Sequence, residues 1–162
     1  MPRISGEVIL NCLREKAYNE LSSFDFAERM DLSFDRTKRE ILFQNQRLTR
    51  TLARIENIGT VEMERILIPE TFTIVSKRIP PMAPFSYFLG LQIFVERGNG
   101  AVLKWIEEFD LEEESKANEP GILAGLERHE REQFQKIGEY YDRIGAANDS
   151  FFDSDGAPRQ HK

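Results

Sequence analysis

Apolar and polar residues alternate along most of the middle of the chain. Near the end of this region, Leu103, Trp105 and Phe109 fall on one side of an extended backbone, with Lys104 and Glu108 on the other. Such alternation predicts β-strands with one face toward a core, and the short connections between them predict antiparallel neighbours. The predicted strands are 3–11, 36–44, 47–57, 59–68, 71–79, 85–97 and a last one after the turn Gly98-Asn99-Gly100.

Helical spacing is found on either side of this strand region. Residues 13–30 predict two short helices that are broken near Ser22, with Ser23 as the N-cap of the second. A long helix is predicted from Pro120-Gly121 to about Gly145, because it carries a stripe of residues three, four or seven positions apart. The stripe consists of Leu126, Gln133, Ile137, Tyr140 and Ile144.

This order of elements predicts one α+β domain over residues 1–145, followed by a disordered tail over residues 146–162. An antiparallel sheet of about seven strands has to curl, and its apolar face has to be covered. The long C-terminal helix is the natural cover, so the sheet is expected to wrap around it. The space between them is either a filled core or a hollow cavity, and the function depends on which.

Charge and composition exclude several classes of function. The net charge of −6 argues against a general nucleic-acid binder and against docking on anionic lipid. The chain has a single cysteine, Cys12, so no disulfide can form within it. Together with only two histidines, this cysteine does not match the ligand pattern of a zinc site. No apolar run approaches the roughly 20 residues of a membrane span, and the start lacks signal-peptide features. We therefore expect a cytoplasmic protein without a metal.

Arginines and aromatic residues stand among apolar neighbours on the predicted strands. The arginines either face solvent and pair with glutamates across strands, or one or two lie in an apolar pocket. In such a pocket an arginine is costly unless it meets an anion or a polarised oxygen. The arginines are Arg50, Arg54, Arg65 and Arg78. The aromatic residues, which belong either to a plain core or to a pocket wall, are Phe72, Phe85, Tyr87, Phe88 and Trp105.

The stretch "GNGAVLKWIEEFDL" resembles the START-like, helix-grip superfamily in its hairpin, its tryptophan and its glutamate–phenylalanine pair. The earlier stretch "VILNCLREKAYNEL" is similar to the opening strand and first helix of that superfamily. Within it, residues 59–69 and 84–112 look most like bacterial polyketide aromatase/cyclases of the tetracenomycin type. The resemblance extends from about residue 4 to residue 145. It implies a helix-grip fold with two short helices after the first strand.

Enzymes of this branch fold a poly-β-keto chain, held by an acyl carrier protein, inside a hydrophobic cavity. They direct aldol ring closure and dehydration in antibiotic and other secondary metabolite biosynthesis, without a metal or redox cofactor. The resemblance therefore implies a polyketide intermediate as substrate, an acyl carrier protein and a ketosynthase as partners, and a monomer or weak dimer. The alternatives are a non-catalytic carrier of a lipid, quinone or aromatic ligand, and a filled core that serves protein contacts.

The resemblance also assigns roles by position. Arg78 matches a cavity arginine, while Leu67 stands where the family has its catalytic arginine, so Arg65 on the same face is expected to replace it. Tyr87 is the predicted proton relay, although Gly90 could mark a β-bulge that exchanges the faces of its strand. The expected catalytic residues are thus Arg78, Arg65 and Tyr87. The expected substrate-binding residues are Phe72, Phe85, Phe88, Trp105 and Gln133.

Overall fold

The computed structural model describes residues 1–149, apart from residues 24, 27–29, 31–37, 56–58 and 80–83. Seven strands form one antiparallel sheet in the order β1-β7-β6-β5-β4-β3-β2. The strands are β1 (Arg3–Leu10), β2 (Lys38–Gln44), β3 (Leu48–Ile55), β4 (Gly59–Ile68), β5 (Thr73–Arg78), β6 (Phe85–Arg97) and β7 (Gly100–Leu111). The helices are α1 (Arg14–Ser22), α3 (Glu119–Asp149) and the short 3-10 helices η1 (Pro69–Thr71) and η2 (Glu113–Asn118).

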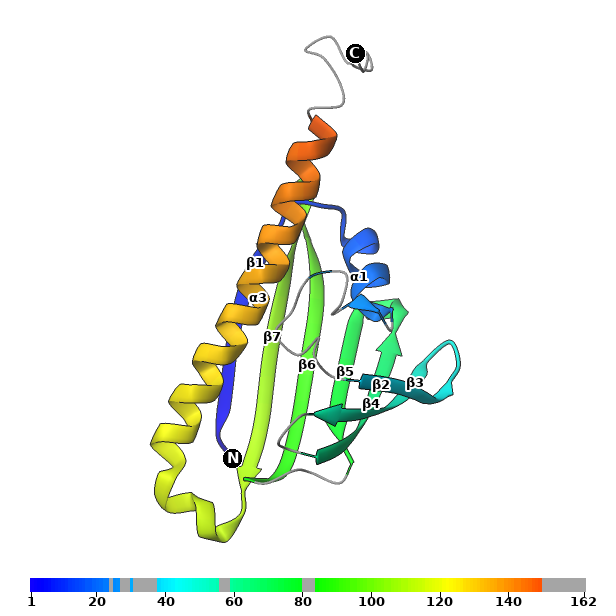
Figure 1. Ribbon diagram of the computed structural model, residues 1–162. Coiled ribbons are helices and arrows are strands. Elements are labelled where there is room, and N and C mark those ends of the chain that lie inside the picture. The colour runs from blue at the N-terminus through cyan, green and yellow to red at the C-terminus, as the bar shows by residue number, and fades with distance from the viewer. Residues whose placement is uncertain (24, 27–29, 31–37, 56–58, 80–83, 150–162) are drawn as a thin grey trace.

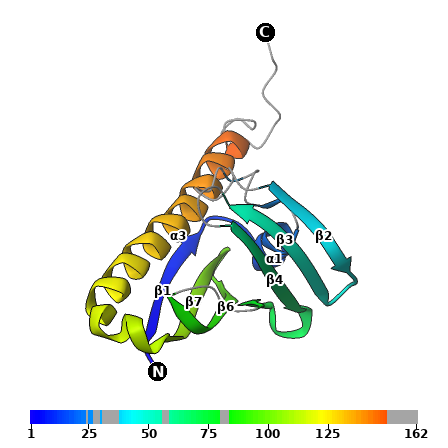
Figure 2. The same ribbon diagram turned by 60° about the horizontal axis from the view of Figure 1, so that its bottom comes forward.

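The sheet curls around the long C-terminal helix, as the sequence predicts (Figure 1). The helix α3 runs along the arm formed by β1, β7 and β6, while β2, β3 and β4 turn away from that arm (Figure 2). The helix continues to Asp149, past its expected end at about Gly145. The second short helix predicted within 13–30 falls mostly outside the described residues, and so do residues 150–162 of the tail.

The main core lies between the inner face of the sheet and the helices α1 and α3. Trp105 of β7 is 2% exposed and stacks on Phe134 of α3, with ring centroids 4.8 Å apart and planes at 5°. The indole lies directly over β1, because a Cβ atom at Gly6 would come within 2.5 Å of its Cζ2. Gly138 lets α3 approach the same strand, since a Cβ atom there would be 2.8 Å from Val8 Cγ2. Two glycines therefore set the distance between helix and sheet.

A smaller aromatic cluster occupies the other end of the inner face. Phe85, Phe88, Phe109 and Leu111 are buried together there. The rings of Phe88 and Phe109 contact Phe85 edge-on, with centroids 5.2 and 5.4 Å away. Both core clusters exclude water, so a polar side chain between them sits in a region of low dielectric constant.

An irregularity in β6 decides which of its side chains face inward. The register with β7 shifts between Phe85 and Tyr87, which adds one residue to β6. Phe85 and Phe88 are both buried as a result, whereas Tyr87 is 38% exposed on the opposite face. Gly90 keeps regular pairing with Glu107 on one side and Ser76 on the other. The bulge is therefore at the start of the strand and not at Gly90.

Candidate functional site

Polar side chains from three strands meet on the inner face between the two core clusters. The pairing register aligns Glu107 of β7 with Gly90, Ser76 and Arg65 on the next three strands. Arg78 lies two residues further along β5 than Ser76 and so points to the same face. Residues that are far apart in sequence thus share one face because the sheet is a meander.

Glu107 is the most deeply placed acid of this group. Its side chain is 8% exposed, and its Oε2 is buried with no hydrogen-bond partner among the described residues. Gly90 lies next to the carboxyl across the strand pair: a Cβ atom there would make ordinary van der Waals contact, 3.9 Å from Glu107 Cγ and Oε1. Burial, followed by the charge of Glu130 on α3, raises the pKa of Glu107 to about 9, against an ordinary value of 4.5.

Burial and the charge of Glu130 both disfavour the carboxylate form of Glu107, so this side chain holds a proton at neutral pH. A carboxylic acid that stays neutral at pH 7 inside an apolar site is a hydrogen-bond and proton donor. This is the chemical group that the site offers to an oxygen atom of a ligand.

Arg78 brings the positive charge to the site. Its guanidinium lies over the ring of Phe88, with Cζ 4.7 Å from the centroid, and 5.9 Å from that of Phe85. Burial lowers the pKa of Arg78, and the charges of Glu107 and Glu130 act against this, so the side chain remains a cation. Within the part of the chain that the structure describes, no carboxylate forms an ion pair with it. Its donors are thus available to an anionic or polarised oxygen.

Arg65, the expected replacement for the catalytic arginine, is held by the fold itself. It is 9% exposed and donates a hydrogen bond to the Leu21 carbonyl at the C-terminal end of α1. Its Cζ lies 4.6 Å from the centroid of the Phe26 ring. A carbonyl in the last turn of a helix lacks a partner within the helix, so Arg65 joins α1 to the sheet. Arg65 therefore has a structural role: it holds α1 in position against the sheet.

We expect Arg65→Met to destabilise the protein by about 2 kcal/mol, because the buried Leu21 carbonyl loses its donor. Thermal unfolding measures this, and Arg50→Met on the outer face, where Arg50 is 42% exposed, is the matched control with a smaller effect. An unchanged melting temperature for Arg65→Met would contradict this structural role of Arg65.

The other predicted site residues divide into two groups. Phe85, Phe88 and Trp105 face inward, and Gln133 is buried at 6% exposure on α3. Tyr87 does not join them: the bulge turns it to the outer face, so the structure provides no path for it as a proton relay.

Phe72 lies at the far end of the inner face, against Tyr18 and under the Arg14 guanidinium, 3.9 Å from its ring centroid. Sequence reasoning missed Glu107 and Gln92 as site residues. The Oε1 of Gln92 is buried without a hydrogen-bond partner among the described residues. Simple alternation gave the signal for both, because Glu107 shares the face of Trp105 and Gln92 pairs with Trp105.

The chain has the helix-grip fold, as the sequence predicts. The protein TTHA0849 from Thermus thermophilus superposes with a TM-score of 0.70 at 13% identity, over 88% of this chain and 99% of that one. The Zhui aromatase/cyclase from Streptomyces sp. R1128 gives 0.68 at 16% identity, over 90% and 97%. Norcoclaurine synthase from Thalictrum flavum gives 0.65 at 17% identity, over 91% and 96%.

A scan against protein-family models and a sequence search of curated proteins find no match. The structural similarity therefore establishes the fold alone. The function has to be inferred from the arrangement of Glu107, Glu130 and Arg78. None of the described helices is long and apolar enough to cross a membrane. Among the described residues, no group of three or more histidine, cysteine, aspartate or glutamate side chains could hold a metal ion.

Proposed function

We propose that this protein is a cytoplasmic polyketide aromatase/cyclase that closes and dehydrates a ring in a poly-β-ketone held by an acyl carrier protein. The observation that carries the proposal is the pair of Glu107 and Arg78 side chains on the same inner face, between the two core clusters. Burial raises the pKa of Glu107, so this pair combines a neutral acid with a cation. The similar fold of the Zhui aromatase/cyclase supports it.

The reaction requires one carbon of the substrate to lose a proton and attack a carbonyl carbon of the same chain. Negative charge develops first on the enolate oxygen and then on the alkoxide that is formed with the new carbon–carbon bond. Arg78 stabilises this oxygen by its charge, and Glu107 supplies the proton that turns the alkoxide into a hydroxyl. The Glu130 carboxylate accepts the proton that the carbon loses and passes it on to Glu107, which restores the acid. In the dehydration step a second carbon-bound proton is lost to Glu130, while Glu107 protonates the hydroxyl that leaves as water.

The aromatic side chains suit the remainder of such a substrate. Phe85, Phe88 and Phe109 present ring faces and edges beside the polar groups, and Trp105 closes the site on the side of α3. Flat, conjugated ketones pack well on such surfaces, which fix the chain in the fold that brings the two reacting carbons together. Exclusion of water by the same rings limits uncontrolled condensation of the chain.

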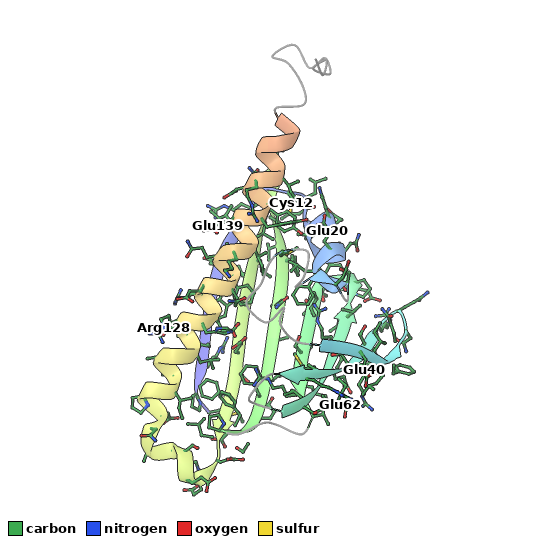
Figure 3. All side chains as sticks on the ribbon, in the orientation of Figure 1. Cys12, Glu20, Glu40, Glu62, Arg128 and Glu139 are labelled. Atoms are coloured by element: carbon green, nitrogen blue, oxygen red, sulfur yellow. The ribbon has the colours of Figure 1, made fainter. Side chains whose placement is uncertain are left out.

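The proposal is tested by adding the protein to a ketosynthase and acyl carrier protein that release a reactive poly-β-ketone. The wild type is expected to direct the mixture toward one cyclised product. Arg78→Ala should lower the yield of that product by about a hundredfold, because the developing oxyanion loses its cation. Arg128→Ala is the matched control, since Arg128 lies on the solvent side of α3 and points away from the sheet (Figure 3).

The same experiment separates the enzyme from a carrier of an apolar ligand. The carrier hypothesis is favoured by the hydrogen bond from Arg65 to α1, because Arg78 is then the cation that would anchor a ligand on the inner face. A carrier would leave the product mixture of the synthase unchanged and would retain an apolar molecule in native mass spectrometry. An unchanged mixture with the wild-type protein overturns the cyclase assignment.

A further inference from the structure

The outer face of the sheet carries an apolar stripe along β6. Its side chains alternate with the inward-facing ones and are Tyr87, Leu89, Leu91, Ile93 and Val95. Tyr87 and Val95 are each 38% exposed, and Ile9 on β1, on the same outer face, is 62% exposed. The described helices α1 and α3 both pack on the opposite face. Because β6 is apolar on both faces, its sequence is typical of a strand that is covered on both faces.

The stripe continues sideways along one row of the pairing register. Leu91 is aligned with Val75 on β5 and with Ile106 on β7, and Ile106 is aligned with Ser5 on β1. This row contains no charged side chain, and it lies at the middle of the stripe. It therefore defines a natural centre for a contact.

Charged residues on β1 and β7 are arranged with opposite signs on the two sides of that central row. Two residues away on one side, Arg3 pairs with Glu108, and their side chains form an ion pair of 3.9 Å. Two residues away on the other side, Glu7 is aligned with Lys104. Each strand thus carries an acid at one end of this segment and a base at the other.

We propose that a second copy of this chain packs on this face, around a two-fold axis that lies in the interface along the row of Leu91 and Ile106. Such an axis turns each strand antiparallel to its equivalent in the other copy. Leu91 then meets Leu91 of the partner subunit, and Leu89 meets the partner's Ile93. Lys104 lies opposite the partner's Glu108, and Arg3 lies opposite the partner's Glu7. The interface is isologous, so every favourable pair occurs twice.

A second copy fits this face better than other occupants. The reversal of charge across the centre is self-complementary, which an unrelated partner or a lipid surface has no need to match. The protein also has a net charge of −6, which opposes binding to an anionic membrane. Two sheets that pack face to face bury aliphatic side chains between them at a spacing of about 10 Å, the arrangement of a β-sandwich.

The proposal is tested by sedimentation equilibrium of the full chain over a wide range of concentration. The wild type is expected to dimerise, and Leu91→Glu should be monomeric, because two carboxylates would meet at the axis. Lys104→Glu and Glu108→Lys should each raise the dimer dissociation constant by about tenfold or more, since each puts like charges opposite one another. The double variant Lys104→Glu/Glu108→Lys should recover the wild-type value.

Two controls keep the test specific. Arg128→Glu reverses a charge on the far side of the molecule and should leave the dissociation constant unchanged, and circular dichroism should show that every variant is folded. A wild type that stays monomeric overturns the proposal, as does a dimer that Leu91→Glu does not affect. Failure of the double variant to recover dimerisation overturns the two-fold arrangement. None of these outcomes depends on catalytic activity, so they are independent of the proposed function.

Discussion

Glu107→Gln is expected to abolish most of the cyclisation activity while making the protein more stable at neutral pH. The amide cannot give up a proton, so the rate should fall by about 10²–10⁴-fold. It keeps the size and polarity of the buried side chain, and it removes the cost of burying an ionisable group. A product assay and thermal unfolding of the same preparation measure the two effects.

The gain in stability follows from the direction of the Glu107 pKa shift. Between pH 4.5 and about 9 the unfolded chain releases the proton of Glu107 and the folded chain retains it. Ionisation therefore stabilises the unfolded state and not the folded state, by about 1.4 kcal/mol for each pH unit. At pH 7, about 2.5 pH units above 4.5, Glu107→Gln should thus stabilise the protein by about 3–4 kcal/mol, and the difference should vanish below pH 4.5.

The activity of the wild type should change with pH for the same reason. As the pH rises through about 9, Glu107 loses its proton, and the turnover should fall with it. Glu107→Gln should show no such fall, which separates loss of the acid from a general effect of alkali. Full activity of the Gln variant, or a lower stability than the wild type at pH 7, would contradict the assignment of a neutral acid.

Gly6→Ala is expected to destabilise the protein by about 3 kcal/mol, which lowers the melting temperature by about 10 °C in a chain of this length. The new Cβ would lie 2.5 Å from Cζ2 of Trp105, well inside van der Waals contact. The indole cannot move aside, because it is 2% exposed and stacked on Phe134. Thermal unfolding followed by circular dichroism measures the change.

Gly125→Ala is the matched control for this substitution. Gly125 lies within α3, and a Cβ atom there would have nothing within 4 Å. Alanine is a better helix former than glycine, so this variant should gain about 0.5–1 kcal/mol. A Gly6→Ala variant that melts at the wild-type temperature would mean that the indole of Trp105 does not rest on β1.

Most of the architecture could be predicted from the sequence, because the strands and the long helix follow from local patterns of apolar and polar residues. Period-two alternation located the strands, and a stripe of period 3.6 located the helix α3. A single sheet with one long helix left few ways to bury its apolar face, so the helix-grip arrangement followed. For the arginines, alternation left both faces of the sheet open, and the structure places Arg65 and Arg78 on the inner face.

Other features of the candidate site depended on contacts between distant segments. The bulge after Phe85 turned Tyr87 outward, because one extra residue in β6 exchanges the faces of the strand before it. Arg65 donates a hydrogen bond to the Leu21 carbonyl at the end of α1, a partner 44 residues away in sequence.

By itself, the sequence determined most of the strands and helices, and which residues of a regular strand share one face. The tertiary structure alone decided that Glu107 is buried and exposed to the charge of Glu130, and so carries a proton at neutral pH. The reason is that alternation is a property of neighbouring residues, whereas burial and charge at one carboxyl depend on everything that packs against it.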